Sequence, residues 1–234
     1  MYARLIGEDI ALKVDGPLLF LRRTVEVGLN EAVEVEAPDG TRLGRIAALD
    51  EESITVEVLD ETSGLALDGT RIRFFGEPLR FQVGPGLLGR VFNGVGQPID
   101  GGPPLAADRA FRIEGMPIKP SARVAPSEFL ETGFTSIDVM NSLVRGQKLP
   151  IFSGGGLPHD RIAVDIACNA RLRGGGAQEF AIVFAGIGIP HDSAEFFRQE
   201  LEKSGALART VLFLNLASDS SAQRLLTPRF ALTA

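Results

Sequence analysis

The sequence predicts a β plus α/β protein, in which a small N-terminal β-barrel precedes an incomplete α/β domain with a parallel sheet. Three observations predict this fold class. Short apolar segments separated by tight turns run from the N-terminus to about Phe75. From residue 149 onward, strand-length apolar runs alternate with segments of helical spacing. Three consecutive glycines lie between the first such run and the helix that follows it. We predict domains at 1–75 and 76–234.

The predicted barrel rests on alternating patterns with turn residues between them. Residues 32–36 alternate apolar and acidic side chains, residues 38–40 supply a Pro-Asp-Gly turn, and 41–49 form the returning strand. In the segment 54–58 the branched apolar residues share one face, as expected of a half-buried strand. The run 71–75 is the predicted last strand. We expect the acidic residues on the alternate positions to face solvent, and no catalytic cluster is evident in this region.

Between residues 76 and 127 the chain is rich in glycine and proline, but apolar residues are interleaved with them. This composition favours a packed, irregular connection over a disordered linker. The apolar residues are Leu87, Leu88, Val91, Phe92 and Ile99. The glycines at 94 and 96 resemble a dinucleotide fingerprint, which we reject because no strand is predicted before them and no helix after them. A helix is predicted over 136–144, with Gly146 as its C-cap.

The α/β region is predicted from the alternation of strands and helices. Asp192 and Glu195 suggest a capping-box variant at the start of the second helix, which Gly205 ends. We expect Pro228 to interrupt the last helix. The predicted strands lie at 151–152, 180–185 and 210–215, and the predicted helices at 161–168, after Asp192 and from Ser220 or Ser221. Three strands are few for a sheet covered on both faces, so the domain is predicted to be incomplete.

The glycine-rich stretch between the first strand and helix resembles a phosphate loop without its chemistry. In the motif G-x-x-x-x-G-K-[ST], the lysine reaches the outer phosphates and the hydroxyl holds magnesium. Here Ser153 and Pro158 fall on the two glycines, His159 on the lysine and Asp160 on the Ser/Thr. The alternative is a plain glycine turn, with Asp160 as a helix cap. The candidate nucleotide-binding residues, for which only weak binding is expected, are Ser153, Gly154, Gly155, Gly156, Leu157, Pro158, His159 and Asp160.

Composition excludes several classes of function. A formal net charge of −6 and a pI near 5.1 argue against a general nucleic-acid binder. The two histidines lack neighbouring ligands at metal-site spacing, so no metal site is predicted. The single cysteine, Cys168, is expected to be a buried, inert thiol. No stretch has the length of a membrane span, and residues 1–5 do not form a secretion signal, so we predict a cytoplasmic protein.

Longer motifs carry a specific resemblance. Residues 88–101 and 132–138 resemble the nucleotide-binding subunits of rotary ATPases. Residues 138–153, running into Gly156-Leu157-Pro158-His159, are similar to the non-catalytic B subunits of V/A-type ATPases (ATP synthases), in which a degenerate loop is normal. The segments 205–215 and 226–229 are similar to the same family. The resemblance covers nearly the whole chain and is weakest at residues 1–15.

The resemblance implies an N-terminal barrel in the crown of a ring and a RecA-like P-loop domain that faces the catalytic A subunit. The implied partners are this A subunit, in an alternating hexameric ring, and the central and peripheral stalk subunits. The complex would couple ATP synthesis or hydrolysis to ion transport through a membrane sector made of other chains, so the contact with the membrane would be indirect. The implied role is regulatory and structural. No catalytic activity and no required cofactor are expected, and ATP or ADP would bind weakly at the interface with the catalytic partner.

The chain also departs from this family. Its members continue for roughly as many residues again, with further strands, an interfacial arginine and a helical C-terminal domain, so we expect this sequence to be an N-terminal portion. The loop at 174–176 looks shorter than usual, and no arginine here is matched to the interfacial role. Three alternatives stay open: a remnant without function in the ring, an independent NTPase, and a RecA-like nucleic-acid-binding protein. The missing loop lysine opposes the second. The acidic balance and the absence of tryptophan oppose the third.

Overall fold

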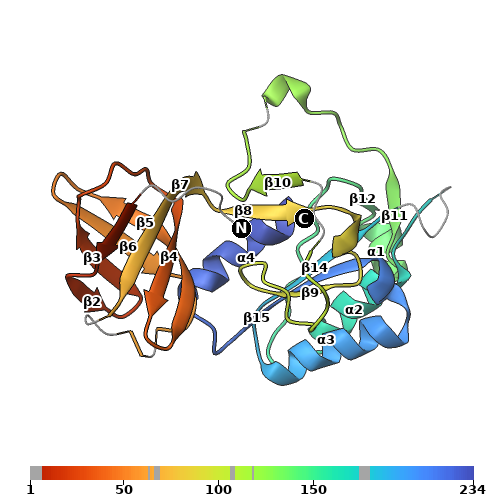
Figure 1. Cartoon of the computed structure of the whole chain (residues 1–234). Helices are drawn as coiled ribbons and strands as arrows, with labels where there is room; N and C mark the ends of the chain where they lie inside the picture. Colours follow the sequence, from red (N-terminus) through yellow and green to blue (C-terminus); the bar gives the residue numbers. More distant parts are fainter. Residues whose placement is uncertain (1–6, 63, 66–68, 106–108, 118, 174–179) are drawn as a thin grey trace.

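A computed structural model describes residues 7–62, 64–65, 69–105, 109–117, 119–173 and 180–234. An antiparallel barrel is followed by an α/β body (Figure 1), which confirms the predicted fold class. The first five residues and the glycines at 174–176, on which two of the sequence predictions depend, lie outside the described residues.

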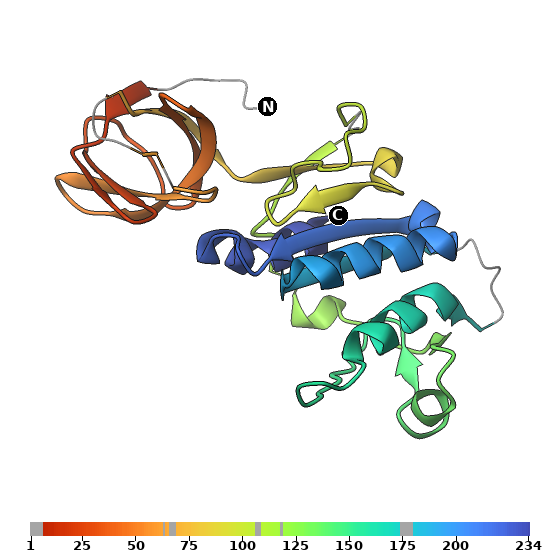
Figure 2. The ribbon, with the colours of Figure 1, turned by 90° about the horizontal axis from the view of Figure 1, so that it is seen from below.

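The barrel sheet contains seven antiparallel strands, which curl into a ring when viewed from below (Figure 2). Their spatial order is β1-β7-β4-β5-β6-β3-β2. In this order β4 and β5 form one hairpin, and β5 and β6 form the next. The predicted Pro-Asp-Gly turn joins β4 to β5, with Ala37 opposite Gly40. The strands are β1 (Gly7–Ile10), β2 (Lys13–Asp15), β3 (Leu18–Arg22), β4 (Glu31–Ala37), β5 (Gly40–Leu49), β6 (Ser53–Val58) and β7 (Arg71–Pro78).

Alternation along these strands builds the barrel core. Ile54, Val56 and Val58 of β6 are fully buried, as predicted, and pack with branched residues of the neighbouring strands. The acidic side chains of Glu34 and Glu36 on β4 are partly exposed and pair with Arg73 of β7 at 3.2 and 2.6 Å. β7 continues to Pro78, three residues beyond the predicted domain boundary at 75.

The connection between the barrel and the later α/β elements is partly packed against the core. It comprises β8 (Arg80–Val83), a 3₁₀ turn η1 (Pro85–Leu87), β9 (Val91–Asn93), β10 (Arg109–Arg112) and a 3₁₀ turn η2 (Pro120–Ala122). Leu87, Val91 and Phe92 are buried as expected, whereas Leu88 and Ile99 are exposed. A strand, β9, does lead into the glycines at 94 and 96, contrary to the prediction. The chain then turns back, with Phe92 bridging to Pro98, rather than entering a helix.

The α/β body is a parallel sheet in the order β14-β15-β9, covered on both faces. Alternate residues of β15 pack in different cores. Phe213 packs on the side of α4, and Leu212 and Leu214 pack on the side of α3. The elements are β14 (Ile182–Ile189), α3 (His191–Lys203), the 3₁₀ turn η3 (Ala206–Arg209), β15 (Thr210–Leu216) and α4 (Ser221–Thr233).

Three details of this region differ from the sequence predictions. β14 extends four residues past the predicted end at 185, and its register with β15 shifts between Ile187 and Ile189. α3 begins after Pro190 without a side-chain cap, so the predicted capping box is wrong; Glu195 binds Arg198 instead. α4 continues through Pro228 to Thr233 without ending there.

A third group of elements carries the glycine loop. A small sheet in the order β12-β11-β13 pairs β11 (Phe129–Glu131) with β12 (Leu143–Val144) and β13 (Arg171–Leu172). α1 (Thr135–Met140) and α2 (His159–Asn169) belong to the same group. The helix predicted over 136–144 therefore ends at Met140. Residues 143 and 144 pair with β11, and Gly146, at a φ of +90°, lies in the following turn rather than at a helix C-cap.

The barrel and the α/β body share one apolar core. Ala32 and Leu59 of the barrel region belong to the same buried cluster as Phe81, Phe213 and Phe230. The aromatic rings in this cluster meet at centroid distances of 5.3 to 5.8 Å. A hydrogen bond of 2.6 Å from the Ser220 hydroxyl to the Leu59 carbonyl joins the start of α4 to the barrel. The two bodies are therefore packed as one unit.

Candidate functional site

The predicted phosphate loop is an exposed turn in front of α2. Residues 149–154 have no regular structure, and the Leu157 N–H donates to the Gly154 carbonyl at 3.4 Å. The predicted strand at 151–152 is absent; the Phe152 side chain is 92% exposed. A strand needs a neighbour for its backbone groups. In the described part of the chain, β14 pairs only with β15, and no strand is paired with residues 151–152.

The three glycines leave open space above the loop. A side chain added at Gly154, Gly155 or Gly156 would meet no heavy atom within 4 Å. Only Gly156 has a positive φ, +83°, which favours glycine over other residues. Backbone N–H groups could approach a phosphate here, but the packing of the domain does not require glycine at 154 or 155.

The two residues at the Lys and Ser/Thr positions of the motif have other partners. α2 begins at His159, and its N-cap is Pro158, which has no side-chain capping bond, so the prediction that Asp160 is the cap is wrong. Asp160 lies in the first turn, where one carboxylate oxygen accepts a hydrogen bond from the Ser193 hydroxyl of α3 at 2.8 Å. Its other oxygen lies 3.5 Å from Nε2 of His159. A carboxylate therefore occupies the helix N-terminus that a phosphate would need.

The nearest arginine on α2 is directed away from the loop. The Arg161 guanidinium pairs with Asp165 at 2.9 Å and with Glu200 of α3 at 3.0 Å. The hydrogen bond to Asp165 raises the pKa of Arg161. The eight predicted residues thus lie together, Ser153 to Pro158 in the loop and His159 and Asp160 in the first turn of α2, but with neither a lysine nor a Ser/Thr hydroxyl at the motif's binding positions. Cys168, on the same helix, is half-buried beside the Ser204 hydroxyl at 3.1 Å, rather than fully buried.

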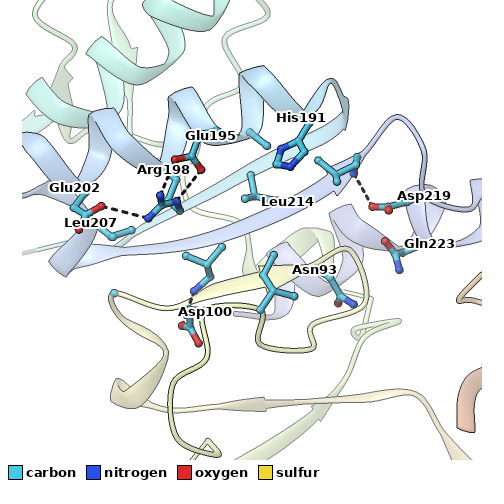
Figure 3. Close-up of a pocket in the computed structure, with 15 residues that line it drawn as sticks. Asn93, Asp100, His191, Glu195, Arg198, Glu202, Leu207, Leu214, Asp219 and Gln223 are labelled. Atoms are coloured by element: carbon cyan, nitrogen blue, oxygen red, sulfur yellow. Dashed lines mark hydrogen bonds and ion pairs between the residues drawn. The ribbon is translucent and has the colours of Figure 1, made fainter. Parts of the chain in front are cut away.

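A cavity of about 620 Å³ lies between α3 and the β9 hairpin, which consists of β9 and the returning residues 94–100 (Figure 3). Its floor is apolar, with Val91, Leu207 and Leu214 among its lining residues. Glu195, Arg198 and Glu202 of α3 line one side. The Arg198 guanidinium bonds to Glu195 at 2.7 Å and to Glu202 at 3.4 Å. This pairing lowers the pKa of Glu195 to about 2. Sequence reasoning missed the cavity because its lining comes from segments a hundred residues apart.

The opposite side of the cavity is held by Asp100. Its carboxylate accepts hydrogen bonds from the Arg90 guanidinium and from the backbone N–H groups of Val91 and Gly102, at 3.1 and 3.0 Å. The guanidinium, followed by these backbone donors, holds the pKa of Asp100 well below its usual range. Asp100 thus links the returning end of the β9 hairpin to Val91, the first residue of β9.

The carboxyl ends of β14 and β15 meet in a buried polar network. The Asn215 side chain accepts from the Gly188 N–H at 3.1 Å and donates to Asp219 and Gln223 at 3.2 Å each. Arg224 donates to the Ala217 carbonyl at 3.0 Å. The network fixes the loops at the sheet edge where α/β proteins commonly bind ligands.

Two further findings concern the described residues. No group of three or more His, Cys, Asp or Glu among them is arranged to hold a metal ion. None of the helices in the described part of the chain is both long enough and apolar enough to cross a membrane.

Comparisons with known proteins give consistent matches. Residues 12–76 match the model of the ATP synthase alpha/beta family, beta-barrel domain, and residues 133–234 match the model of the ATP synthase alpha/beta family, nucleotide-binding domain. The chain is 50% identical over 222 residues to the B subunit of an A-type ATP synthase from Methanopyrus kandleri. That alignment covers 94% of this chain and 22% of the relative, so the chain spans about a fifth of the length of this relative.

Proposed function

The chain belongs to the ATP synthase alpha/beta family, and from this premise we propose that it serves as a non-catalytic, regulatory and structural component of a V/A-type rotary ATPase. In this role it alternates with the catalytic A subunit in a hexameric ring, together with central and peripheral stalk subunits. The complex couples ATP synthesis or hydrolysis to ion transport. The chain lies in the cytoplasmic head and reaches the membrane only through other subunits.

One observation carries the non-catalytic part of this proposal. Where a working loop has a lysine and a hydroxyl, this chain has His159 and Asp160, and the Asp160 carboxylate is bound to Ser193. A phosphoryl-transfer site acts almost entirely by positioning and charge stabilisation, which need the lysine and a metal ion. The exposed glycines can still offer backbone N–H groups. ATP or ADP therefore binds weakly at most, at the interface with the catalytic partner, and no cofactor is required for the fold.

The test of this proposal is a comparison of the natural loop with a restored one. The variant Ser153→Gly, Pro158→Gly, His159→Lys, Asp160→Thr recreates the full phosphate-loop motif. We expect the natural chain to bind MgATP with a Kd of about 1 mM or weaker and the restored chain to bind at least about tenfold more tightly, measured by calorimetry. A matched control, Ser153→Gly with Pro158→Gly, should stay near the natural affinity. ATP hydrolysis by the natural chain alone would refute the non-catalytic role, and tight MgATP binding would refute the weak binding proposed for the loop.

Membership of the ring is tested separately. The chain and a version extended to full family length are each co-expressed with a catalytic A subunit, and the purified complexes are assayed for subunit ratio and ATPase activity. The proposal requires the extended version to form an alternating, ATP-hydrolysing ring. If the short chain also enters the ring, the barrel and this part of the α/β body are sufficient for assembly. If neither enters it, the ring function is wrong.

A further inference from the structure

Two exposed surfaces of this chain have opposite charge and both include apolar groups. The acidic cleft is the cavity between α3 and the β9 hairpin, with Glu195, Glu202 and Asp219 among its lining residues (Figure 3). The basic arm comprises residues 109–117 and 119–124, which include β10 and η2. The function proposed above uses neither surface.

The charges of the acidic cleft are partly compensated. Arg198 pairs with both glutamates of α3 that line the cleft, Glu195 and Glu202, so one positive charge faces two negative ones, and the Glu202 side chain is 64% exposed. Arg90 is paired with Asp100, and Arg224 is engaged with Asn215 and with carbonyl groups at the end of β15. The cleft therefore keeps an excess of negative charge, from Glu202 and Asp219, above an apolar floor.

The basic arm has the complementary composition. It carries Arg109, Arg112, Lys119 and Arg123, and Glu114 is the acidic residue among its described positions. None of these four cations forms an ion pair with a residue that the structure describes. The arm also exposes apolar side chains that have little cover: Phe111, Met116 and Val124 are 49, 89 and 88% exposed. Exposed apolar groups rimmed by charge are typical of interaction surfaces.

The two surfaces cannot meet within one molecule. β10 and the green segment that includes η2 lie at the top of Figure 1, whereas α3 lies at the bottom, with the parallel sheet between them. A contact between arm and cleft therefore needs two molecules. It would join different surfaces of the two copies, in a head-to-tail arrangement that can propagate or close into a ring.

We propose that the acidic cleft of one molecule docks the basic arm of a second copy of this chain. Lys119 and Arg123 of the arm face Glu202, at one end of the cleft, and apolar side chains of the arm cover the cleft floor. Because the paired charges lie at a solvent-exposed rim, the association is weak and weakens further as salt screens the charges. This proposal does not depend on the ring function, since it concerns the isolated chain.

Charge reversal tests the pairing. The variant Glu202→Lys, on the cleft, and the double variant Lys119→Glu, Arg123→Glu, on the arm, are studied by sedimentation equilibrium at low salt and at 0.5 M NaCl. We expect the natural chain to self-associate with concentration at low salt, and each reversed variant to associate about tenfold or more weakly. Lys13→Glu, on the exposed surface of the barrel, is the matched control and should associate like the natural chain.

A mixture of the two reversed variants separates a direct contact from a general effect of charge. In the mixture, the natural arm of the cleft variant can bind the natural cleft of the arm variant, and the two reversed surfaces are again opposite in charge, so association should recover to near the natural level. Far-UV circular dichroism confirms that each variant is folded. The proposal is overturned if the natural chain stays monomeric at all concentrations, if the single reversals leave association unchanged, or if the mixture fails to recover.

Discussion

The strands of the barrel and the segment before the glycine loop are predicted with similar ease from sequence, yet they end in opposite environments. β6 alternates apolar residues toward the barrel interior, where they are fully buried. The apolar pair Ile151 and Phe152 is exposed and pairs with no strand in the described part of the chain. The difference lies in where each segment finds its neighbours, since β5, one of the two strands that flank β6, immediately precedes it in the chain and pairs with it across a short turn.

Antiparallel hairpins can complete themselves locally, whereas a strand of a parallel sheet depends on partners that are distant in sequence. Residues 151–152 have the composition of a buried strand, but composition alone cannot supply the neighbour. β15, which is buried along almost its whole length, has neighbours on both sides, β14 and β9. An apolar run thus indicates a capacity for strand formation, and the fold decides whether that capacity is used.

The largest expected effect is on the free energy of unfolding, when substitutions of a buried and an exposed phenylalanine are compared. Phe213 on β15 is fully buried against the rings of Phe81 and Phe92, so Phe213→Ala should lower the free energy of unfolding by about 3–5 kcal/mol. Phe152→Ala removes a phenyl ring from an exposed loop and should change the free energy of unfolding by no more than about 0.5 kcal/mol. Urea denaturation followed by circular dichroism measures both. A loss above about 1 kcal/mol for Phe152→Ala would show that this side chain is buried in solution.

A smaller loss of stability is expected at Asp100, because its carboxylate holds the β9 hairpin by an ion pair and hydrogen bonds rather than by apolar packing. Its pKa is lowered in the folded state, so its contribution is complete above the ordinary value of 3.8 and is lost as the pH falls below it. Asp100→Asn should therefore cost about 1–2 kcal/mol of unfolding free energy at pH 7.

The natural chain and the Asp100→Asn variant should converge in stability as the pH is lowered through the range below 3.8. Urea midpoints at pH 7, 5, 4 and 3 test this. A difference that is constant across the series would mean that the carboxylate charge contributes nothing and that the variant acts only through hydrogen-bond geometry. Glu195→Gln is a suitable comparison, because that carboxylate is also paired with an arginine but its side chain is more exposed than that of Asp100, 41% against 18%.

The smallest effect is expected within the glycine loop itself. Gly156→Ala forces a side chain onto a φ of +83° and should cost about 1 kcal/mol, which corresponds to a fall in Tm of about 2–4 °C for a chain of this size. Gly155→Ala, one residue earlier, has neither a positive φ nor a nearby atom and should leave Tm unchanged. Calorimetric scans compare the two. Equal effects of both substitutions would indicate that the turn at Gly156 is not held in solution.

The sequence predicted the elements whose determinants are local. The hairpin at 37–40, the buried face of β6 and the start of the last helix at Ser220 or Ser221 were all predicted and are confirmed, because each depends on a turn, an alternation or a cap within a few residues. The capping box at Asp192 was wrong because Glu195 prefers a neighbouring arginine over the backbone.

The candidate site was predicted only in part. The loop, its glycines and the substitutions at 159 and 160 follow from motif spacing. The bond between Asp160 and Ser193 does not, because it depends on how α2 packs against α3. The acidic cleft was missed for the same reason, since β9, α3 and β15 become neighbours only through the parallel sheet. Pro228 within α4 shows the reverse case, in which tertiary packing overrides a strong local signal.

The core shared by Ala32, Leu59 and Phe230 has an evolutionary consequence, because it makes the barrel a poor candidate for recombination. A barrel transplanted from a distant relative would bring its own residues to a seam lined by aromatic rings of the recipient. The Ser220 hydroxyl at the start of α4 would also lose its acceptor, the Leu59 carbonyl, unless the backbone of the transplanted barrel followed the same path. Inheritance should therefore keep the two parts together, and a successful chimera would need both sides of the seam exchanged at once.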